Sequence, residues 1–152
     1  MTRQDMKTPS TEERVYAELR SLRDKVAGIC GSLVATSDGL LVSSDIPDLE
    51  PTRLAALVST TLGLARQTTL ATGRGQFREA IARGTDGYLA VFAAGSAVIA
   101  VIADDDINIG MLHYEAREVI ERITAHSANF VRWSVQAGTA PSAEVTAGGS
   151  SG

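Results

Sequence analysis

Only a few residues in this sequence could hold a metal ion, and their spacing does not gather them into a site. Asp104, Asp105 and Asp106 are consecutive. Their carboxylates therefore point in different directions, whereas a Mg²⁺ site needs ligands with a defined geometry. His113 and His126 fall within one expected helix, but not on neighbouring turns. We interpret the aspartates as a solvated loop and the histidines as surface or boundary residues, and we predict no metal site.

Nucleophilic and nucleotide-binding patterns are equally weak. The single cysteine, Cys30, begins an expected strand, where a small buried thiol is common, and no histidine stands close enough in sequence to activate it. No G-x-x-x-x-G-K-[ST] motif is present, and Gly73-Arg74-Gly75 lacks the third glycine of a dinucleotide fingerprint. The larger aromatic residues are better explained by packing than by a ligand cage. The sequence thus predicts no catalytic residue and no cofactor, and it favours a protein that is not an enzyme.

Composition narrows the class of protein further. The chain has 152 residues, of which 44% are hydrophobic and 21% charged, as expected for one folded domain. A net charge of −4 argues against nucleic acid as a partner. The lone cysteine and the lack of an apolar N-terminal stretch favour a cytoplasmic protein. Only Lys7 and Lys25 are lysines among the 14 basic residues, which suggests a GC-rich, bacterial genome.

Capping, turn and periodicity signals predict the helices and strands that would position any site. Ser10 and Glu13 form a capping box, and Asn108 is placed to cap the last helix. We expect one domain at residues 12–134 between a flexible N-terminus at residues 1–11 and a flexible tail at residues 135–152. The expected order is helix, two strands, helix, three strands and helix, with strands near residues 29–36, 40–44, 76–82, 88–93 and 97–103.

The second predicted helix, from Pro51 to about Thr72, is too poor in charge to be exposed on one whole side. Its only charged side chains are Arg53 and Arg66. Such a helix is normally buried on more than one side, and a small sheet covers only one. Three small residues, Ala56, Thr60 and Gly63, form a ridge that would let a second helix approach closely. We interpret this helix as a self-association surface.

The sequence after this helix predicts an edge strand and then a buried hairpin. Between Gln76 and Ala82 the alternation places Phe77, Glu79 and Ile81 on one face of an edge strand and Arg78 on the other. The stretch from residue 89 to residue 103 carries no charge but is shorter than a membrane span and is interrupted at residues 95–96. We therefore expect a buried hairpin, covered on both faces by helices, and no membrane insertion.

Four segments, read in order, resemble the Roadblock/LC7 domain family. They are Val26–Val34, Ser37–Val42, Gly87–Val91 and Asn108–Leu112, and the likeness extends from about Glu12 to Phe130. The resemblance implies an α+β fold of order αββαβββα. In it the long helix covers one face of a five-stranded antiparallel sheet, and the other two helices cover the opposite face.

The resemblance also implies a homodimer in which the third strands pair and the second helices pack together. The interface residues expected on this basis lie on that helix and that strand: Leu57, Thr60, Thr61, Leu64, Phe77, Arg78 and Glu79.

The function implied by the resemblance is regulation of a partner protein. Bacterial members of the family regulate small Ras-like GTPases, and this sequence looks like the actinobacterial type, typically found with such a GTPase and a sensor-kinase-like protein. Candidate partner-binding residues are Arg53, Ala56, Arg66 and Gln67. Two alternatives stay open: a structural adaptor, as in dynein light chains, without effect on nucleotide turnover, and a small-ligand sensory module. An interior of Ala, Val, Ile and Leu offers little chemistry for a ligand.

Overall fold

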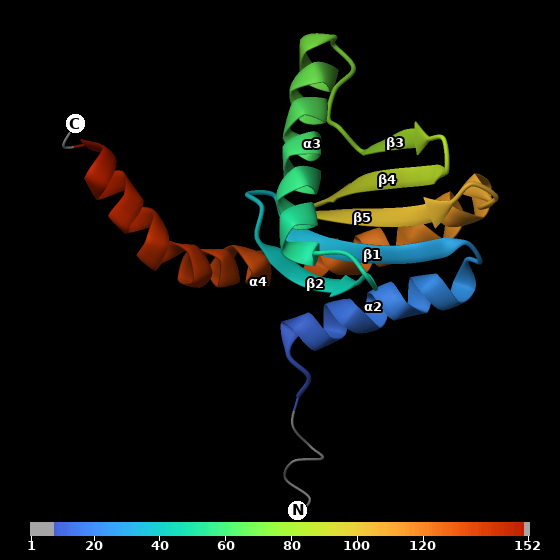
Figure 1. Ribbon diagram of the computed structural model, residues 1–152, viewed down its shortest axis with the longest axis horizontal. Helices are drawn as coiled ribbons and strands as arrows, with labels where there is room; N and C mark the ends of the chain where they lie inside the picture. Colours follow the sequence, from blue (N-terminus) through green and yellow to red (C-terminus); the bar gives the residue numbers. More distant parts are fainter. Residues whose placement is uncertain (1–7, 151–152) are drawn as a thin grey trace, which may run out of the picture.

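The structure is a computed structural model that describes the backbone of residues 8–150 and the side chains of residues 8–130. Its elements are α2 (Thr11–Lys25), β1 (Ile29–Thr36), β2 (Leu41–Asp45), α3 (Pro51–Ala71), β3 (Glu79–Gly84), β4 (Gly87–Ala94), β5 (Ala97–Asp104) and α4 (Ile109–Ser150). The five strands form one antiparallel sheet of order β2-β1-β5-β4-β3 (Figure 1). The predicted fold class and element order are confirmed.

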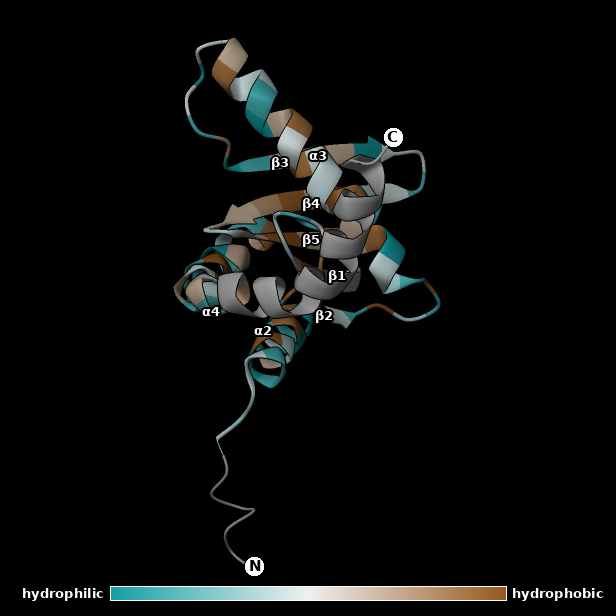
Figure 2. Cartoon of the chain, turned by 90° about the vertical axis from the view of Figure 1, so that its left-hand side faces the viewer, coloured by the Kyte–Doolittle hydropathy of each residue, from teal (hydrophilic) through white to brown (hydrophobic). Residues whose placement is uncertain are grey.

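Helices cover the two faces of the sheet unequally. On one face α2 and α4 pack side by side, and Leu19 and Leu112 are buried there with Phe92 of β4. On the other face α3 stands alone across the strands, and Leu62 is buried with Val91 and its neighbours. The strands β4 and β5 are therefore hydrophobic on both sides. Figure 2 shows these strands mostly in brown, the colour of hydrophobic residues.

Local signals position the two helices of the first face. Ser10 Oγ accepts from the Glu13 amide at 3.1 Å and the Ser10 amide donates to Glu13 Oε1 at 2.8 Å, so the predicted capping box is present. Asn108 Oδ1 accepts from the Met111 amide at 3.0 Å and begins α4 as expected. The stripe at Val15, Leu19 and Leu22 is buried, because helical spacing brings these residues onto the sheet.

The third strand differs from its prediction. It begins at Glu79, and Phe77 lies before it. Phe77 turns toward α3 and is buried there, whereas Glu79 faces α4 on the opposite side of the sheet. The prediction that these two side chains share a face was wrong, because strict alternation holds only inside a strand and the chain enters the ladder after Phe77.

The predicted tail at residues 135–152 falls for the most part within the bounds of the last helix, and its flexibility stays a prediction. The bounds of α4 reach Ser150, so residues 135–150 lie inside this helix. The predicted flexible N-terminus falls for the most part on residues 1–7, outside the described residues. Among the described residues no helix is both long and apolar enough to cross a membrane.

Candidate functional site

An exposed row of leucines and threonines lies on α3. Leu57 and Leu64 are 53% and 62% exposed, and Thr60 and Thr61 between them are exposed as well. Spacings of three, four and seven residues from Leu57 place all four on one side of the helix. We call this set the α3 stripe. Large side chains so open to water favour a surface that another protein covers.

The threonines of the α3 stripe need no partner for their hydroxyl groups. The hydroxyls of Thr60 and Thr61 each donate to the backbone carbonyl oxygen four residues earlier, over 2.9 Å. Their methyl groups are then left to face outward. Covering the α3 stripe therefore leaves no hydroxyl unsatisfied, and the cost that usually opposes burial of threonine is small.

The C-terminal half of α3 extends past the sheet. Every buried residue of the helix lies at or before Leu62, and Leu70 near its end is 64% exposed. Figure 1 shows this half rising beyond β3, and Figure 2 shows hydrophobic bands on it. Beneath it lies a hollow of about 270 Å³, lined by Arg66, Leu70, Gln76 and Phe77. The helix is thus longer than its own sheet can cover.

A second, smaller hollow lies beside α3 on the same face of the sheet. Its volume is about 120 Å³, and its walls are almost entirely apolar. Leu57 of the α3 stripe borders it, together with Leu89 of β4 and Ile102 of β5. Both strand residues are only partly buried, because α3 crosses the strands without covering this part of the face.

The strand β3 is the free edge next to this surface. It pairs with β4 from Glu79↔Phe92 to Gly84↔Gly87, and no described strand pairs with its other side. All its residues except Ala80 are exposed. An uncovered edge of this kind presents unpaired backbone groups to a second strand.

Glu79, at the start of β3, forms a side-chain contact with another element of its own chain. Its carboxylate meets Nε2 of His113, which projects from α4, and His113 Nδ1 lies 3.1 Å from the carbonyl oxygen of Ile109. The hydrogen bond to Glu79, and secondly that to Ile109, raise the pKa of His113. Sequence reasoning missed this pair, since 34 positions separate its members and neither has a local signal.

The predicted interface residues are only partly gathered. The four residues of the α3 stripe share one side of α3, whereas Glu79 faces α4 on the opposite side of the sheet, and Arg78 is exposed. Phe77 is 8% exposed, so its own chain already covers it. The predicted partner-binding residues divide in the same way. Arg53, Ala56 and Gln67 are exposed along the outer side of α3, whereas Arg66 leans toward the sheet, with Nη2 3.5 Å from the Gly95 carbonyl oxygen.

The residues considered for chemistry do not form a reactive site in the described part of the chain. Cys30 Sγ donates to Asp104 Oδ1 at 3.0 Å, and this hydrogen bond, with burial, raises the pKa of the thiol and keeps it protonated. Asp105 and Asp106 are exposed. Among the described residues no three His, Cys, Asp or Glu side chains are close enough together to hold a metal ion.

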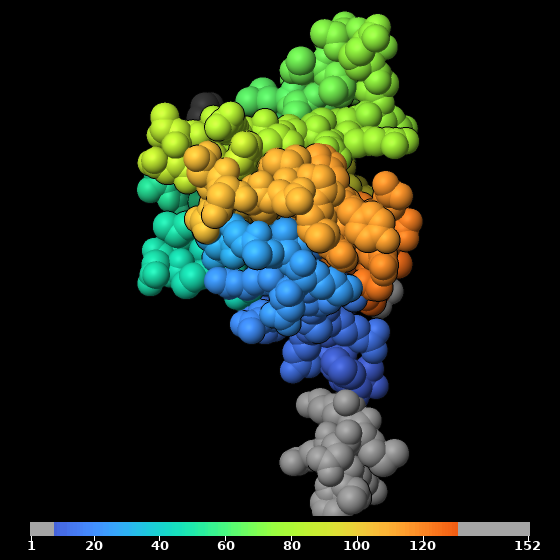
Figure 3. Space-filling view, turned by 90° about the vertical axis from the view of Figure 1, so that its right-hand side faces the viewer, coloured from blue at the N-terminus to red at the C-terminus, as the bar shows by residue number. Residues whose placement is uncertain are grey.

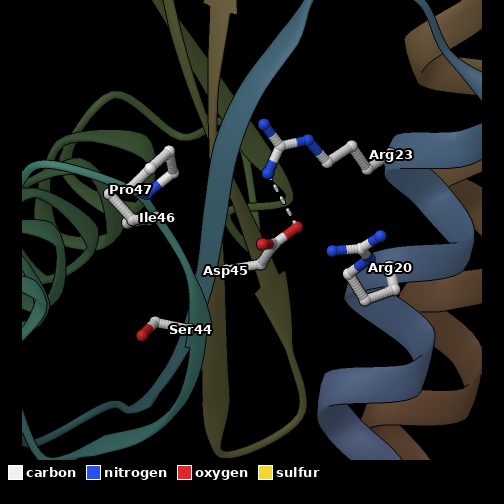
Figure 4. Close-up of a pocket in the computed structure, with 6 residues that line it drawn as sticks. All are labelled: Arg20, Arg23, Ser44, Asp45, Ile46 and Pro47. Carbon is white, nitrogen blue, oxygen red and sulfur yellow. Dashed lines mark hydrogen bonds and ion pairs between the residues drawn. The ribbon is translucent and has the colours of Figure 1, made fainter.

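One polar hollow, of about 670 Å³, lies where α2 meets the opposite edge strand β2. Figure 4 shows Arg20 and Arg23 reaching from α2 toward Asp45, while Ser44 points to the other side of the strand. Arg23 Nη1 donates to Asp45 Oδ2 at 3.0 Å. Because Asp45 is only 9% exposed, this ion pair fastens α2 to the edge of the sheet, and we assign it a structural role.

Comparison with known proteins agrees with the observed fold. The family model described as Roadblock/LC7 domain matches residues 15–103. An uncharacterized protein of Methanocaldococcus jannaschii is 29% identical over 114 residues, which cover 74% of this chain and 96% of that protein.

Two solved structures have a similar fold. The Roadblock/LC7 domain from Streptomyces avermitilis is similar with a TM-score of 0.68 and 23% identity, over 74% of this chain and 96% of that one. Myxococcus xanthus MglB has a TM-score of 0.72 and 18% identity, over 81% of this chain and 94% of its own. At these identities the likeness to the solved structures concerns the fold.

Proposed function

We propose a regulatory function without catalysis for this chain, which belongs to the Roadblock/LC7 domain family. In this proposal two copies associate through α3 and β3, and the dimer binds a small Ras-like GTPase and changes its rate of hydrolysis. The observation that carries the proposal is the α3 stripe, a row of exposed leucines on a helix that extends beyond the free edge of its own sheet.

A two-fold arrangement would cover this surface in both copies at once. If β3 pairs with β3 of a second chain, the two sheets become continuous, and the end of each α3 reaches over its partner's sheet. The apolar hollow beside α3, bordered by Leu89 and Ile102, lies on the face that would receive it. Leu64 and Leu70 are exposed on the part of the helix that makes this reach. A stable dimer of this kind buries about 1,200–2,000 Å².

The outer side of α3 then offers a surface for the GTPase. Arg53, Ala56 and Gln67 are exposed there in the single chain, next to the residues that a second copy would cover, and a dimer would present this surface twice. Such a platform acts by stabilising one arrangement of the mobile switch segments of the GTPase. Arg66 is less suited to enter a foreign active site, because its guanidinium leans toward Gly95 of its own chain.

The test is phosphate release from a Ras-like GTPase of the same organism, timed with and without the purified chain. We expect faster release, and we expect Arg53→Ala to raise the half-saturating concentration while leaving the maximal rate within about tenfold. An arginine that entered the active site would instead contribute about 10³–10⁵ to the rate. Arg117→Ala, an exposed arginine on α4, is the matched control and should leave both quantities unchanged.

The same assay separates regulator from adaptor. Binding without any change in hydrolysis would favour a structural adaptor, as in the dynein-type members, and would contradict regulation. Absence of both binding and stimulation would refute a GTPase partner altogether. A sensor-kinase-like partner and a cytoplasmic location stay predictions from the sequence.

A further inference from the structure

We propose that His113 is a proton-dependent clamp that holds the edge strand β3 against α4, so that self-association through β3 weakens as the pH rises. The part of this inference that concerns self-association rests on the proposed function. The clamp itself rests on contacts within one chain, namely those of His113 with Glu79 and with the Ile109 carbonyl.

The geometry of the ring requires two protons. Nδ1 of His113 faces the carbonyl oxygen of Ile109 at 3.1 Å, and Nε2 faces a carboxylate oxygen of Glu79. Both partners are acceptors, and a neutral imidazole carries only one N–H. The neutral ring would therefore set a lone pair against one of these two oxygens. Only the imidazolium donates to both, and the bond to the carboxylate is then charge-assisted.

Glu79 is the charged group that acts on the ring of His113. The β4 side contributes Phe92, whose ring lies edge-on with centroids 6.3 Å apart and carries no charge. From β3 the facing group is Glu79, and burial opposes protonation only as a lesser effect. On its own helix the next charged residue on this side is Arg117, one turn further on. About two fifths of the His113 side chain is exposed, so protons exchange with solvent freely.

The clamp matters because β3 has few other attachments. Apart from its ladder with β4, it is anchored on the α3 face by Ala80 and by Phe77 just before it. At its far end Arg83 lies over the ring of Tyr88 and forms an exposed pair with Asp105 at 3.7 Å. His113 supplies the attachment on the α4 face (Figure 3, where orange α4 lies against the yellow-green hairpin). A strand that is anchored on both faces is already ordered, so pairing with a second strand costs less conformational entropy.

The direction of the pH dependence follows from the raised pKa of His113. A histidine whose pKa is higher in the folded protein than in the unfolded chain adds stability fully below the unfolded value. That contribution is lost as the pH rises through the folded value. The clamp is therefore closed in mildly acidic solution and opens toward alkaline pH, and the ordering of β3 changes in the same direction.

The clamp is tested first by NMR titration of the two histidines of this chain. We expect the His113 resonances to titrate above the ordinary value and to move down in Glu79→Gln, while the His126 resonances stay the same in both proteins. An unchanged His113 titration in Glu79→Gln would overturn the clamp. Amide exchange in β3, corrected for its intrinsic pH dependence, should increase with pH in the wild type and not in His113→Gln.

Sedimentation equilibrium from pH 5.5 to 8.5 tests the link to self-association. We expect the dimer dissociation constant of the wild type to rise severalfold across this range and that of His113→Gln to stay nearly flat. His126→Gln, the matched control, should keep the wild-type dependence. Equal pH dependence in wild type and His113→Gln would overturn the link. A monomer at every pH would instead refute the proposed dimer, and the NMR titration would still decide the clamp.

Discussion

Two leucines on opposite sides of α3, Leu62 and Leu64, allow the contribution of α3 to folding to be measured separately from its contribution to self-association. Leu62 is 1% exposed and packs against the sheet, whereas Leu64 is 62% exposed on the α3 stripe. Truncating a fully buried leucine costs about 3–5 kcal/mol, which in a chain of this size lowers Tm by roughly 10 °C. Truncating Leu64 removes little that its own chain buries, so its cost in the monomer should be within about 0.5 kcal/mol.

The assay is thermal unfolding of Leu62→Ala and Leu64→Ala, followed by circular dichroism at low and at high protein concentration. At low concentration only Leu62→Ala should lose stability. At high concentration the wild type should gain Tm through mass action, and Leu64→Ala should gain less. If Leu64→Ala were as destabilising as Leu62→Ala at every concentration, Leu64 would be part of the folded core and the reasoning on the α3 stripe would fail.

Two further substitutions test the fold that presents these surfaces. Gly87→Ala should lower the free energy of unfolding by more than about 2 kcal/mol in urea denaturation, because a Cβ there would lie 2.3 Å from the Ala103 carbonyl oxygen of β5. A neutral result would contradict this close approach of β4 to β5. Ser10→Ala should cost about 1 kcal/mol by loss of the capping box with Glu13, and Ser10→Asp, which keeps an acceptor, should recover most of it.

Much of the fold could be predicted because its signals are local. The Ser10 and Asn108 caps, the uncharged run of β4 and β5 and the stripe on α2 each depend on neighbours in sequence. The start of β3 could not be placed, because Phe77 has a hydrophobic side chain that fits a strand pattern equally well. Its actual position depends on α3, which comes from another part of the chain.

The candidate site was predictable only in outline. Low charge on α3 indicated that the helix needs more cover than a sheet gives, and exposure of Leu57 and Leu64 agrees with that reasoning. What could not be predicted is how single side chains are used within the chain. Arg66 leans on a turn 29 residues away, and Glu79 meets His113 from another element. Such contacts depend on tertiary packing, so the spacing of residues along the sequence does not indicate them.

In the proposed dimer a second copy of this chain covers α3 and the edge of β3. Light scattering at micromolar concentration measures this directly, with the double variant Leu57→Glu/Leu64→Glu as comparison. We expect twice the chain mass of 16.0 kDa for the wild type and the single mass for the folded variant. A wild type that stays at 16.0 kDa, or a double variant that keeps the doubled mass, would contradict the proposed dimer.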